Sequence, residues 1–312
     1  MAASRLTQLG WFEAKYAHMR QRGRTLFMIG FLAPACLVYG AFVVWPLLQS
    51  FYISLFSWRG VSLNRRFIGM DNYERLWDDK VFWKALQNNL WLLVVSMAGL
   101  FVIGLLVAHA MQGSGRIAKG IRSIVLFPQV ISLVAVAIVW QFMYNPSYGL
   151  VTDGLKSVGL EWSSGILGTS SAALPAVGVA FLWYAVGFYI MLFATGLKAI
   201  PAEVIEAAEL DGSHGLHRFS QITWPMLWSV KRTAAIYVVI NVMNVFALVF
   251  LMTNGGPDRA TEVMLTYLYQ IGFTNYQFGQ ATALAVLNFI VAMTLAVILM
   301  IVFRKNPEEA RR

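Results

Sequence analysis

The sequence is poor in charged residues. Asp, Glu, Lys and Arg together make up only 12% of the 312 residues, about half of the roughly 25% that is usual in soluble globular proteins. So little charge cannot cover a globule of this size with water-compatible side chains. The composition therefore excludes a soluble protein, a disordered chain and a nucleic-acid-binding domain.

Cysteine and histidine are also scarce. Cys36 is the single cysteine, and the four histidines are His18, His109, His214 and His217. A disulfide framework needs paired cysteines, and a zinc or haem site needs clustered Cys or His ligands. The sequence therefore predicts no metal site and no redox function.

Apolar residues dominate what is present. They account for 58% of the chain, and six long stretches contain no Asp, Glu, Lys or Arg. A helix needs about 20 apolar residues to cross the hydrocarbon core of a membrane. We therefore predict an all-α integral membrane protein in which a domain of residues 25–303 has six transmembrane helices, at about 27–56, 85–112, 121–144, 172–197, 233–254 and 281–303.

The basic residues are distributed unevenly over the segments between these spans. Sixteen of the 24 lie in the tails 1–24 and 304–312 and in the loops 116–122 and 198–232. With six spans, these four segments share one side of the membrane, and basic flanks stay on the cytoplasmic side. Both termini are therefore predicted to be cytoplasmic.

The loop 198–232 contains two predicted helices. Pro201 suits a first helical turn, and Ala202 to Leu210 are strong helix formers. Asp211-Gly212 ends this helix, and a second piece is predicted from Leu216 to Thr223, ending before Pro225. This helix-turn-helix element is too small to fold alone. Its face of Val204, Ile205, Ala207 and Ala208 needs a cover, for which the membrane surface and a protein partner both remain open.

Several motifs resemble one transporter family. Glu206-Ala207-Ala208, Gly212, Ile222 and Pro225 are spaced as in the EAA loop of permease subunits of ATP-binding-cassette importers, although Trp224 stands where that family has leucine. The chain is also similar to carbohydrate permeases of the maltose and glycerol-3-phosphate type in the stretches 32–58, 67–73 (FIGMDNY), 127–132 (FPQVIS), 145–151 (NPSYGLV) and 252–257 (MTNGGP). The resemblance covers nearly the whole chain and implies a multi-pass protein of the bacterial or archaeal inner membrane.

The resemblance also implies partners and roles. It implies a transport subunit rather than an enzyme, which works with a second permease subunit as a heterodimer, two ATPase subunits and an extracytoplasmic solute-binding protein. In the coupling loop, Glu206 would bind a basic residue of the ATPase, Ala207 and Ala208 would permit close helix approach, and Gly212 would supply the turn. The sequence has no Walker-type glycine-rich lysine motif. ATP and Mg would therefore be bound by the ATPase, with no cofactor on this chain.

Polar residues inside spans are candidate substrate contacts, because burying them in a membrane is costly. Asn241 and Asn244 lie three residues apart in the fifth predicted span, near Phe246. Trp183, Tyr184 and Phe188 crowd the fourth. Amides and aromatic faces suit an uncharged saccharide, and the resemblance places the sugar site along this part of the fifth span. Alternatively, the asparagines pair with a neighbouring helix and the aromatic rings only pack.

Two other functional classes compete with ATP-driven sugar import. An ion-coupled secondary transporter of small polar solutes usually carries an ionisable residue within its spans, and none of the six stretches contains Asp, Glu, Lys or Arg. A membrane-embedded enzyme needs a clustered nucleophile, acid–base pair or metal set, and His109 stands alone among the predicted spans. The predicted function is therefore import of a sugar or oligosaccharide by alternating access, with the identity of the sugar left open.

Overall fold

The computed structural model describes residues 27–60, 64–112 and 116–304. The predicted tail 1–24, and the tail 304–312 apart from Arg304, lie outside these residues. The chain divides into two compact units, Met1–Ile53 and Ser54–Arg312.

The described part of the first unit is one apolar helix, Phe27–Ile53, which is long enough to cross a membrane. It contains a π-helical turn, η1 (Gly40–Val44), followed by α2 (Trp45–Ile53). Pro46 lies two residues after this turn, and its missing N–H removes one of the bonds that would close a regular α-helical turn. The Trp45 N–H accordingly bonds to the carbonyl of Gly40, five residues back. The helix agrees with the predicted first span to within three residues.

The described part of the second unit is helical apart from one short hairpin. Strands β1 (Phe56–Ser57) and β2 (Arg66–Phe67) pair antiparallel, with Phe56 opposite Phe67. The longer helices are α4 (Lys80–Ala110), α5 (Arg116–Val130), α6 (Leu133–Met143), α8 (Ser170–Lys198), α12 (Trp228–Met243) and α15 (Phe278–Val302). The shorter elements are α3 (Asp71–Trp77), α7 (Leu150–Ser157), α9 (Ala202–Leu210), α10 (Gly215–Arg218), η2 (Phe219–Thr223), α11 (Trp224–Met226), α13 (Ala247–Met252), α14 (Met264–Tyr269) and η3 (Gln270–Thr274).

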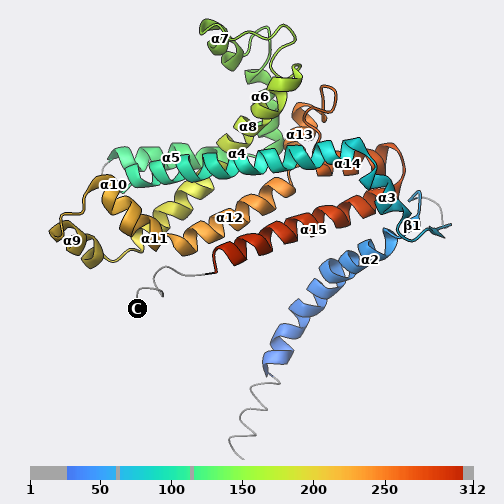
Figure 1. Cartoon of the computed structure of the whole chain (residues 1–312), viewed down its shortest axis with the longest axis horizontal. Helices are drawn as coiled ribbons and strands as arrows, with labels where there is room; N and C mark the ends of the chain where they lie inside the picture. Colours follow the sequence, from blue (N-terminus) through green and yellow to red (C-terminus); the bar gives the residue numbers. More distant parts are fainter. Residues whose placement is uncertain (1–26, 61–63, 113–115, 305–312) are drawn as a thin grey trace, which may run out of the picture. The chain divides into compact units, whose positions relative to one another are not determined.

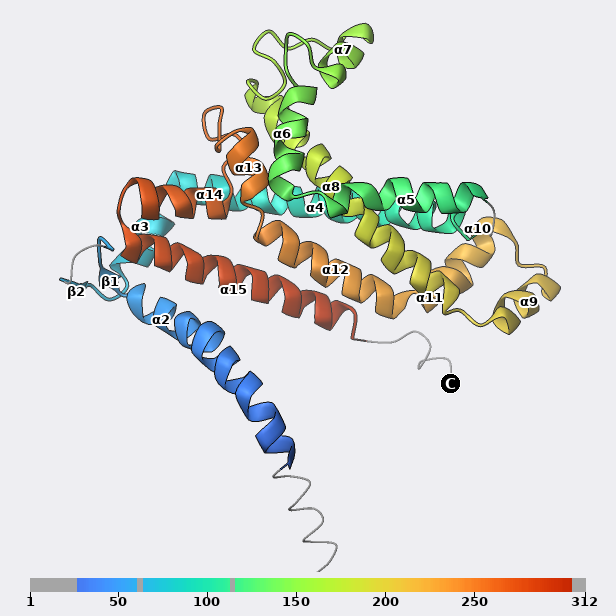
Figure 2. The same ribbon diagram turned by 180° about the vertical axis from the view of Figure 1, so that it is seen from behind.

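Helices α4 and α8 pack against each other in the core of this unit, and α12 lies between α4 and α15 (Figures 1 and 2). Glycine permits the close approach. A Cβ atom on Gly104 would lie 3.1 Å from the ring of Phe193, and one on Gly187 would lie 2.5 Å from the backbone oxygen of Val125 in α5. Small residues let membrane helices approach in this way. Helices α9 to α11 lie at one end of the bundle, which we call the α9 end, and α3, β1 and α14 lie at the other, the α3 end (Figure 1).

The third predicted span, 121–144, is not one straight helix. Its apolar parts, Ile124–Val130 and Leu133–Met143, meet at an angle of 113°. Pro128 lacks an N–H in the last turn of α5, and Ser132 then takes an extended conformation at the start of α6. The prediction of a single helix here is therefore wrong. The second half of this predicted span is α6, which packs against α13. The Gln141 amide of α6 donates to the Leu251 carbonyl oxygen of α13 at 2.5 Å.

The fifth predicted span, 233–254, is also broken. Helix α12 ends at Met243 and α13 begins at Ala247. Two buried asparagines from other helices bind the carbonyl groups at this break. The Asn89 amide of α4 donates to the Val242 oxygen at 2.9 Å, and the Asn288 amide of α15 donates to the Met243 oxygen at 3.2 Å. Side chains can satisfy backbone groups that a helix break releases inside a membrane, so a continuous helix was the wrong expectation.

Among the described residues, four straight helices have the length and hydropathy to cross a membrane, and a fifth is obtained if the bent pair forms one span. The four helices are Phe27–Ile53, Lys80–Ala110, Ser170–Lys198 and Phe278–Val302. All four overlap predicted spans. The all-α membrane fold is therefore confirmed, and the count of six, which needs the broken fifth span, stays a prediction.

The loop 253–263 at the α3 end is held by α4. The Asn88 amide donates to the backbone oxygens of Ala260 and Glu262, at 3.0 and 2.8 Å. The Asn89 oxygen accepts the N–H of Met264 at 2.8 Å. Both asparagines are almost fully buried, so α4, the end of α12 and the start of α14 are joined by buried hydrogen bonds.

The same loop contains a buried carboxylate. The Glu262 side chain accepts hydrogen bonds from Arg259 at 3.0 Å and from Thr266 at 2.6 Å. Beside it, the Tyr267 hydroxyl donates to the Asp79 carboxylate. Burial, and then this hydrogen bond, raise the pKa of Tyr267. The hydroxyl therefore remains a donor throughout the physiological pH range.

Candidate functional site

The predicted coupling loop, residues 198–232, folds as consecutive short helices at the α9 end (Figure 1). Helix α9 follows Pro201 and ends before Asp211, as predicted. The second predicted helix of this loop, Leu216 to Thr223, is longer in the structure. Here α10, η2 and α11 follow one another from Gly215 to Met226. The expectation that it ends before Pro225 is wrong. Pro225 lies in the first turn of α11, where a missing N–H costs little.

Gly212 forms the turn between α9 and α10. Its φ is +76°, a left-handed conformation that costs other residues about 1–2 kcal/mol. A Cβ atom at this position would meet no atom within 4 Å, so the backbone conformation, and not crowding, favours glycine. The Ser213 N–H donates to the Ala208 oxygen at 2.8 Å, and Arg218 pairs with Glu209 across the turn.

The predicted apolar face of α9 is only partly buried by this chain. Ala208 is buried and Val204 and Ile205 are half-buried, whereas Ala207 is exposed beside the exposed Glu206. The prediction that this face needs a further cover therefore stays open, since the chain itself leaves Ala207 exposed. Ala207 and Glu206 both remain accessible to another protein.

Lys231 links the coupling loop to the start of α12. Its ammonium group donates to the Trp224 oxygen at 2.6 Å and lies 3.9 Å from the centre of the Trp224 ring. Only 7% of Lys231 is exposed, and burial lowers its pKa to about 8. No sequence pattern predicts this contact, although Trp224 stands where the resembled family has leucine. Of the other motif residues, Ile222 and Pro225 are half-buried.

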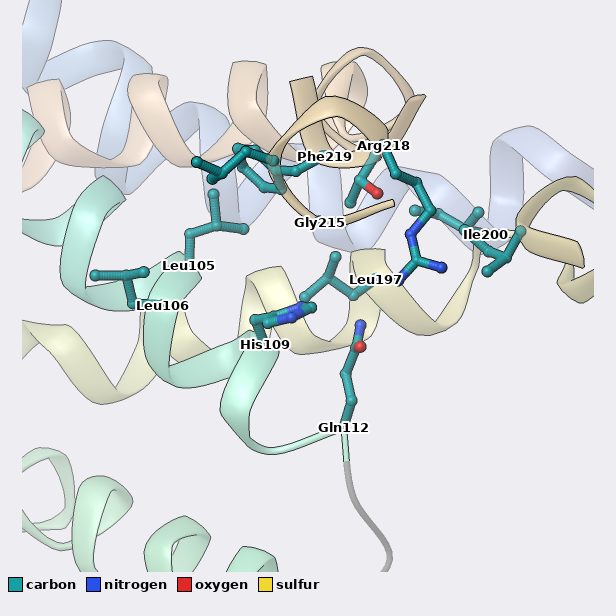
Figure 3. A pocket seen from close by; sticks show the side chains of 12 residues that line it. Leu105, Leu106, His109, Gln112, Leu197, Ile200, Gly215, Arg218 and Phe219 are labelled. Carbon is teal, nitrogen blue, oxygen red and sulfur yellow. The ribbon is translucent and has the colours of Figure 1, made fainter. Parts of the chain in front are cut away.

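A cavity of about 420 Å³ lies between the coupling loop and the ends of α4 and α8. Figure 3 shows the side chains of His109, Gln112 and Arg218 pointing toward the same part of it. The remaining wall is mostly apolar and is formed by Leu105, Leu106, Leu197, Ile200, Ile205, Leu216 and Phe219, with Gly215 and Thr223. Sequence reasoning missed this cavity, because its wall combines residues more than 100 positions apart.

The two asparagines predicted to contact substrate are exposed on α12. The Asn241 and Asn244 amides each donate to a carbonyl four residues back in their own helix, Tyr237 and Ile240, at 2.8 Å. These bonds leave the amide oxygens directed away from that helix turn. Asn244 is also the first residue of the break between α12 and α13.

The predicted aromatic residues divide into separate groups. Phe188 of α8 lies 5.2 Å from the ring of Tyr237 on α12, one turn before Asn241. Tyr184 lies one helical turn before Phe188, on the same face of α8. Trp183 lies on another face and contacts Trp140 of α6, with ring centres 5.9 Å apart. The structure therefore brings Phe188, but not Trp183, close to the asparagines.

Phe246 begins a row of aromatic rings at the helix break. Its ring lies 5.1 Å from Phe250 and 5.6 Å from Tyr269, and Tyr269 lies 5.2 Å from Phe273. Tyr269 and Phe273 are exposed. Exposed amides and aromatic faces therefore adjoin one another at the break of α12. Among the described residues, no group of three or more His, Cys, Asp or Glu could hold a metal ion.

Comparison with known proteins agrees with this architecture. Residues 100–306 match the model of the family described as "binding-protein-dependent transport system inner membrane component". The chain is 34% identical to the probable ABC transporter permease protein YurN of Bacillus subtilis, over 89% of this chain and 96% of that protein. It is 33% identical to the diacetylchitobiose uptake system permease protein NgcF of Streptomyces coelicolor, over 90% and 83% of the two chains.

Two further matches are informative. The trehalose/maltose transport system permease protein MalF of Thermococcus litoralis is 30% identical, over 86% of this chain and 90% of that protein. Among solved structures, a bacterial ABC transporter involved in the import of the acidic polysaccharide alginate matches with a TM-score of 0.78 and 22% identity, over 91% and 97% of the chains. The latter similarity shows a shared fold. Together with the apolar helices, these matches show that the chain is a multi-pass membrane protein and belongs to the family of binding-protein-dependent transport system inner membrane components, the permease subunits of ABC transporters.

Proposed function

We propose that this permease subunit imports a sugar or oligosaccharide. It receives the solute from an extracytoplasmic binding protein and releases it to the cytoplasm by alternating access. The observation that carries the proposal is that Asn241 and Asn244 are exposed at the end of α12 and that the break after this helix contains Phe246, whose ring contacts Tyr269. Sugars are bound by hydrogen bonds to their hydroxyls and by aromatic rings against their apolar faces. The names of the relatives, which include diacetylchitobiose and trehalose/maltose systems, support the same solute class.

The substrate residues form one surface in this proposal. Asn241 and Asn244 bind hydroxyl groups, while Phe246 and Phe188 contact the apolar faces of the sugar. Because the exposed side of α12 is open in this chain, the second permease subunit of a heterodimer completes the enclosure. Trp183 and Tyr184, which the sequence also suggested, contribute less directly, since Trp183 packs against α6.

The energy enters through the coupling loop. Two ATPase subunits bind ATP and Mg, and each permease presents its α9 region to one of them. The exposed Glu206 offers a carboxylate to a basic residue of the ATPase, and exposed Ala207 allows a helix to approach closely. Leu210 and Leu216, which are 90% and 86% exposed, supply apolar surface for the same contact. The remaining motif residues maintain the conformation of the loop. They are Ala208, Gly212, Ile222 and Pro225.

This assignment places the α9 end and both termini in the cytoplasm of a bacterium or archaeon. The distribution of basic residues supports it, because the loop 198–232 and both tails carry most of them. The α3 end, with the loop 253–263, then faces the binding protein.

The test is purification of the tagged chain from its native cells, followed by transport in proteoliposomes. We expect a second permease, two copies of an ATPase and ATP-dependent uptake of radiolabelled maltose, trehalose or diacetylchitobiose that requires the binding protein. The chain alone should show no ATP hydrolysis. Solute accumulation driven by a sodium or proton gradient without ATP would instead establish an ion-coupled secondary transporter.

A further inference from the structure

The cavity beside the coupling loop combines an apolar wall with one polar region. Leu105 and Leu106 of α4 and Leu197 of α8 line it on the side of the bundle. His109, Gln112 and Arg218 converge at one part of it (Figure 3). A cavity of about 420 Å³ falls within the range of small-molecule sites, about 300–1,000 Å³. Its lining therefore suits a molecule with a polar head and an apolar tail.

The apolar wall continues outside the cavity along α4. Leu106 lines the cavity and is 66% exposed, and Val102 and Ile103, one turn earlier, are 58% and 43% exposed. Because α4 is long and apolar enough to cross a membrane, this exposed strip is the surface that acyl chains would cover. A tail that begins in the cavity can thus continue along the helix into the membrane.

Arg218 is the one Lys, Arg, Asp or Glu among the twelve described residues that line the cavity. The sequence has no Asp or Glu between residues 80 and 152 or between 212 and 257, the two stretches that supply His109, Gln112 and Arg218. The acidic residues near the cavity are those of α9, which contributes Ile205 to the wall and carries Glu203, Glu206 and Glu209. All three are exposed, and Arg218 pairs with Glu209, whose side chain is 52% exposed, so these carboxylates lie at the solvent side. An anionic head group complements such a region.

We propose that the cavity binds one anionic phospholipid of the cytoplasmic leaflet. Its phosphate accepts hydrogen bonds from His109, Gln112 and Arg218, and its first acyl carbons lie on Leu105, Leu106 and Leu197. The inference uses the orientation proposed above but is independent of the transported solute. The lipid would occupy the space between the coupling loop and the spans, so it would couple the position of the loop to the lipid composition of the membrane.

The test uses the assembled transport complex, purified in mild detergent and exchanged into nanodiscs of phosphatidylcholine with increasing phosphatidylglycerol. Native mass spectrometry measures the phosphatidylglycerol retained per permease. We expect Arg218→Gln and His109→Leu each to lower the apparent affinity at least about tenfold, because each removes a donor to a charged group. Leu106→Trp, which fills the apolar part from an exposed position, should also lower it.

Lys198→Gln is the matched control. Lys198 is exposed at the end of α8 and does not line the cavity, so its replacement removes one positive charge at the same level of the bundle. If Lys198→Gln and Arg218→Gln lose equal amounts of bound lipid, general surface charge would account for the lipid binding, and the proposal would be overturned. Displacement of the lipid by inorganic phosphate alone would indicate a site for a free anion. Lipid retention only in complexes that lack the ATPase would assign the cavity to that partner.

Discussion

Replacing Asn89 by alanine tests whether the break between α12 and α13 is held from α4. The Asn89 side chain is 1% exposed, and it donates to the Val242 oxygen at 2.9 Å and accepts the Met264 N–H at 2.8 Å. In the alanine variant the Met264 N–H is left buried and unpaired, whereas the Val242 oxygen still accepts the Val245 N–H at 3.2 Å. An unpaired buried group costs about 1–3 kcal/mol, so the variant should lose about 1–3 kcal/mol of stability.

The assay is the thermal unfolding midpoint of the purified complex. One kcal/mol corresponds to roughly 2–4 °C for a chain of 150–250 residues, so the Asn89→Ala midpoint should fall by at least about 2 °C. Gln87→Ala is the matched control, because Gln87 lies two residues away on α4 and is exposed. A midpoint for Asn89→Ala that equals that of Gln87→Ala would refute the role assigned to these hydrogen bonds.

Variants at Gly212 and Asn244 test the proposed function, and a variant at Lys231 tests the burial of its ammonium group. Gly212→Val places a branched side chain at φ +76° and should reduce uptake with the protein still in the membrane, whereas Gly212→Asn, which tolerates this conformation, should retain it; normal uptake by the valine variant would show that this turn does not transmit the ATPase movement. Asn244→Ala should lower uptake per assembled complex roughly tenfold, the loss expected for an unpaired polar group of about 1–3 kcal/mol. Its thermal midpoint should hardly change, because Asn244 is exposed and bonds only to its own helix turn; unchanged uptake would remove it from the site. The Lys231 pKa of about 8 lies below the value of about 10.4 in an unfolded chain, so the unfolded state binds more protons between these pH values and stability should rise with pH across that window. In Lys231→Met this rise should disappear from midpoints measured at pH 7 and pH 10, and a slope equal to that of the native protein would contradict the burial of the ammonium group.

Local sequence was sufficient for the elements whose structure depends on near neighbours. The helix Ala202–Leu210 and its end at Gly212 follow from helix propensity and from the left-handed turn that glycine permits. The long apolar stretches fixed the membrane fold, because the length and hydropathy of a span are properties of one segment. The spacing of the coupling-loop residues was sufficient to suggest the family.

The features that the sequence left undetermined depend on residues far apart in the chain. The break after Met243 is stabilised by Asn89 and Asn288, which lie about 150 residues before it and 45 residues after it. A hydropathy pattern cannot show which buried amide will bind which carbonyl. Likewise, the exposure of Asn244 and the separation of Trp183 from Phe188 follow from how α6, α8 and α12 pack. Sequence alone thus determined that this chain crosses a membrane and predicted a coupling loop, whereas only the packing of its helices decided where the spans break and which polar groups the breaks expose.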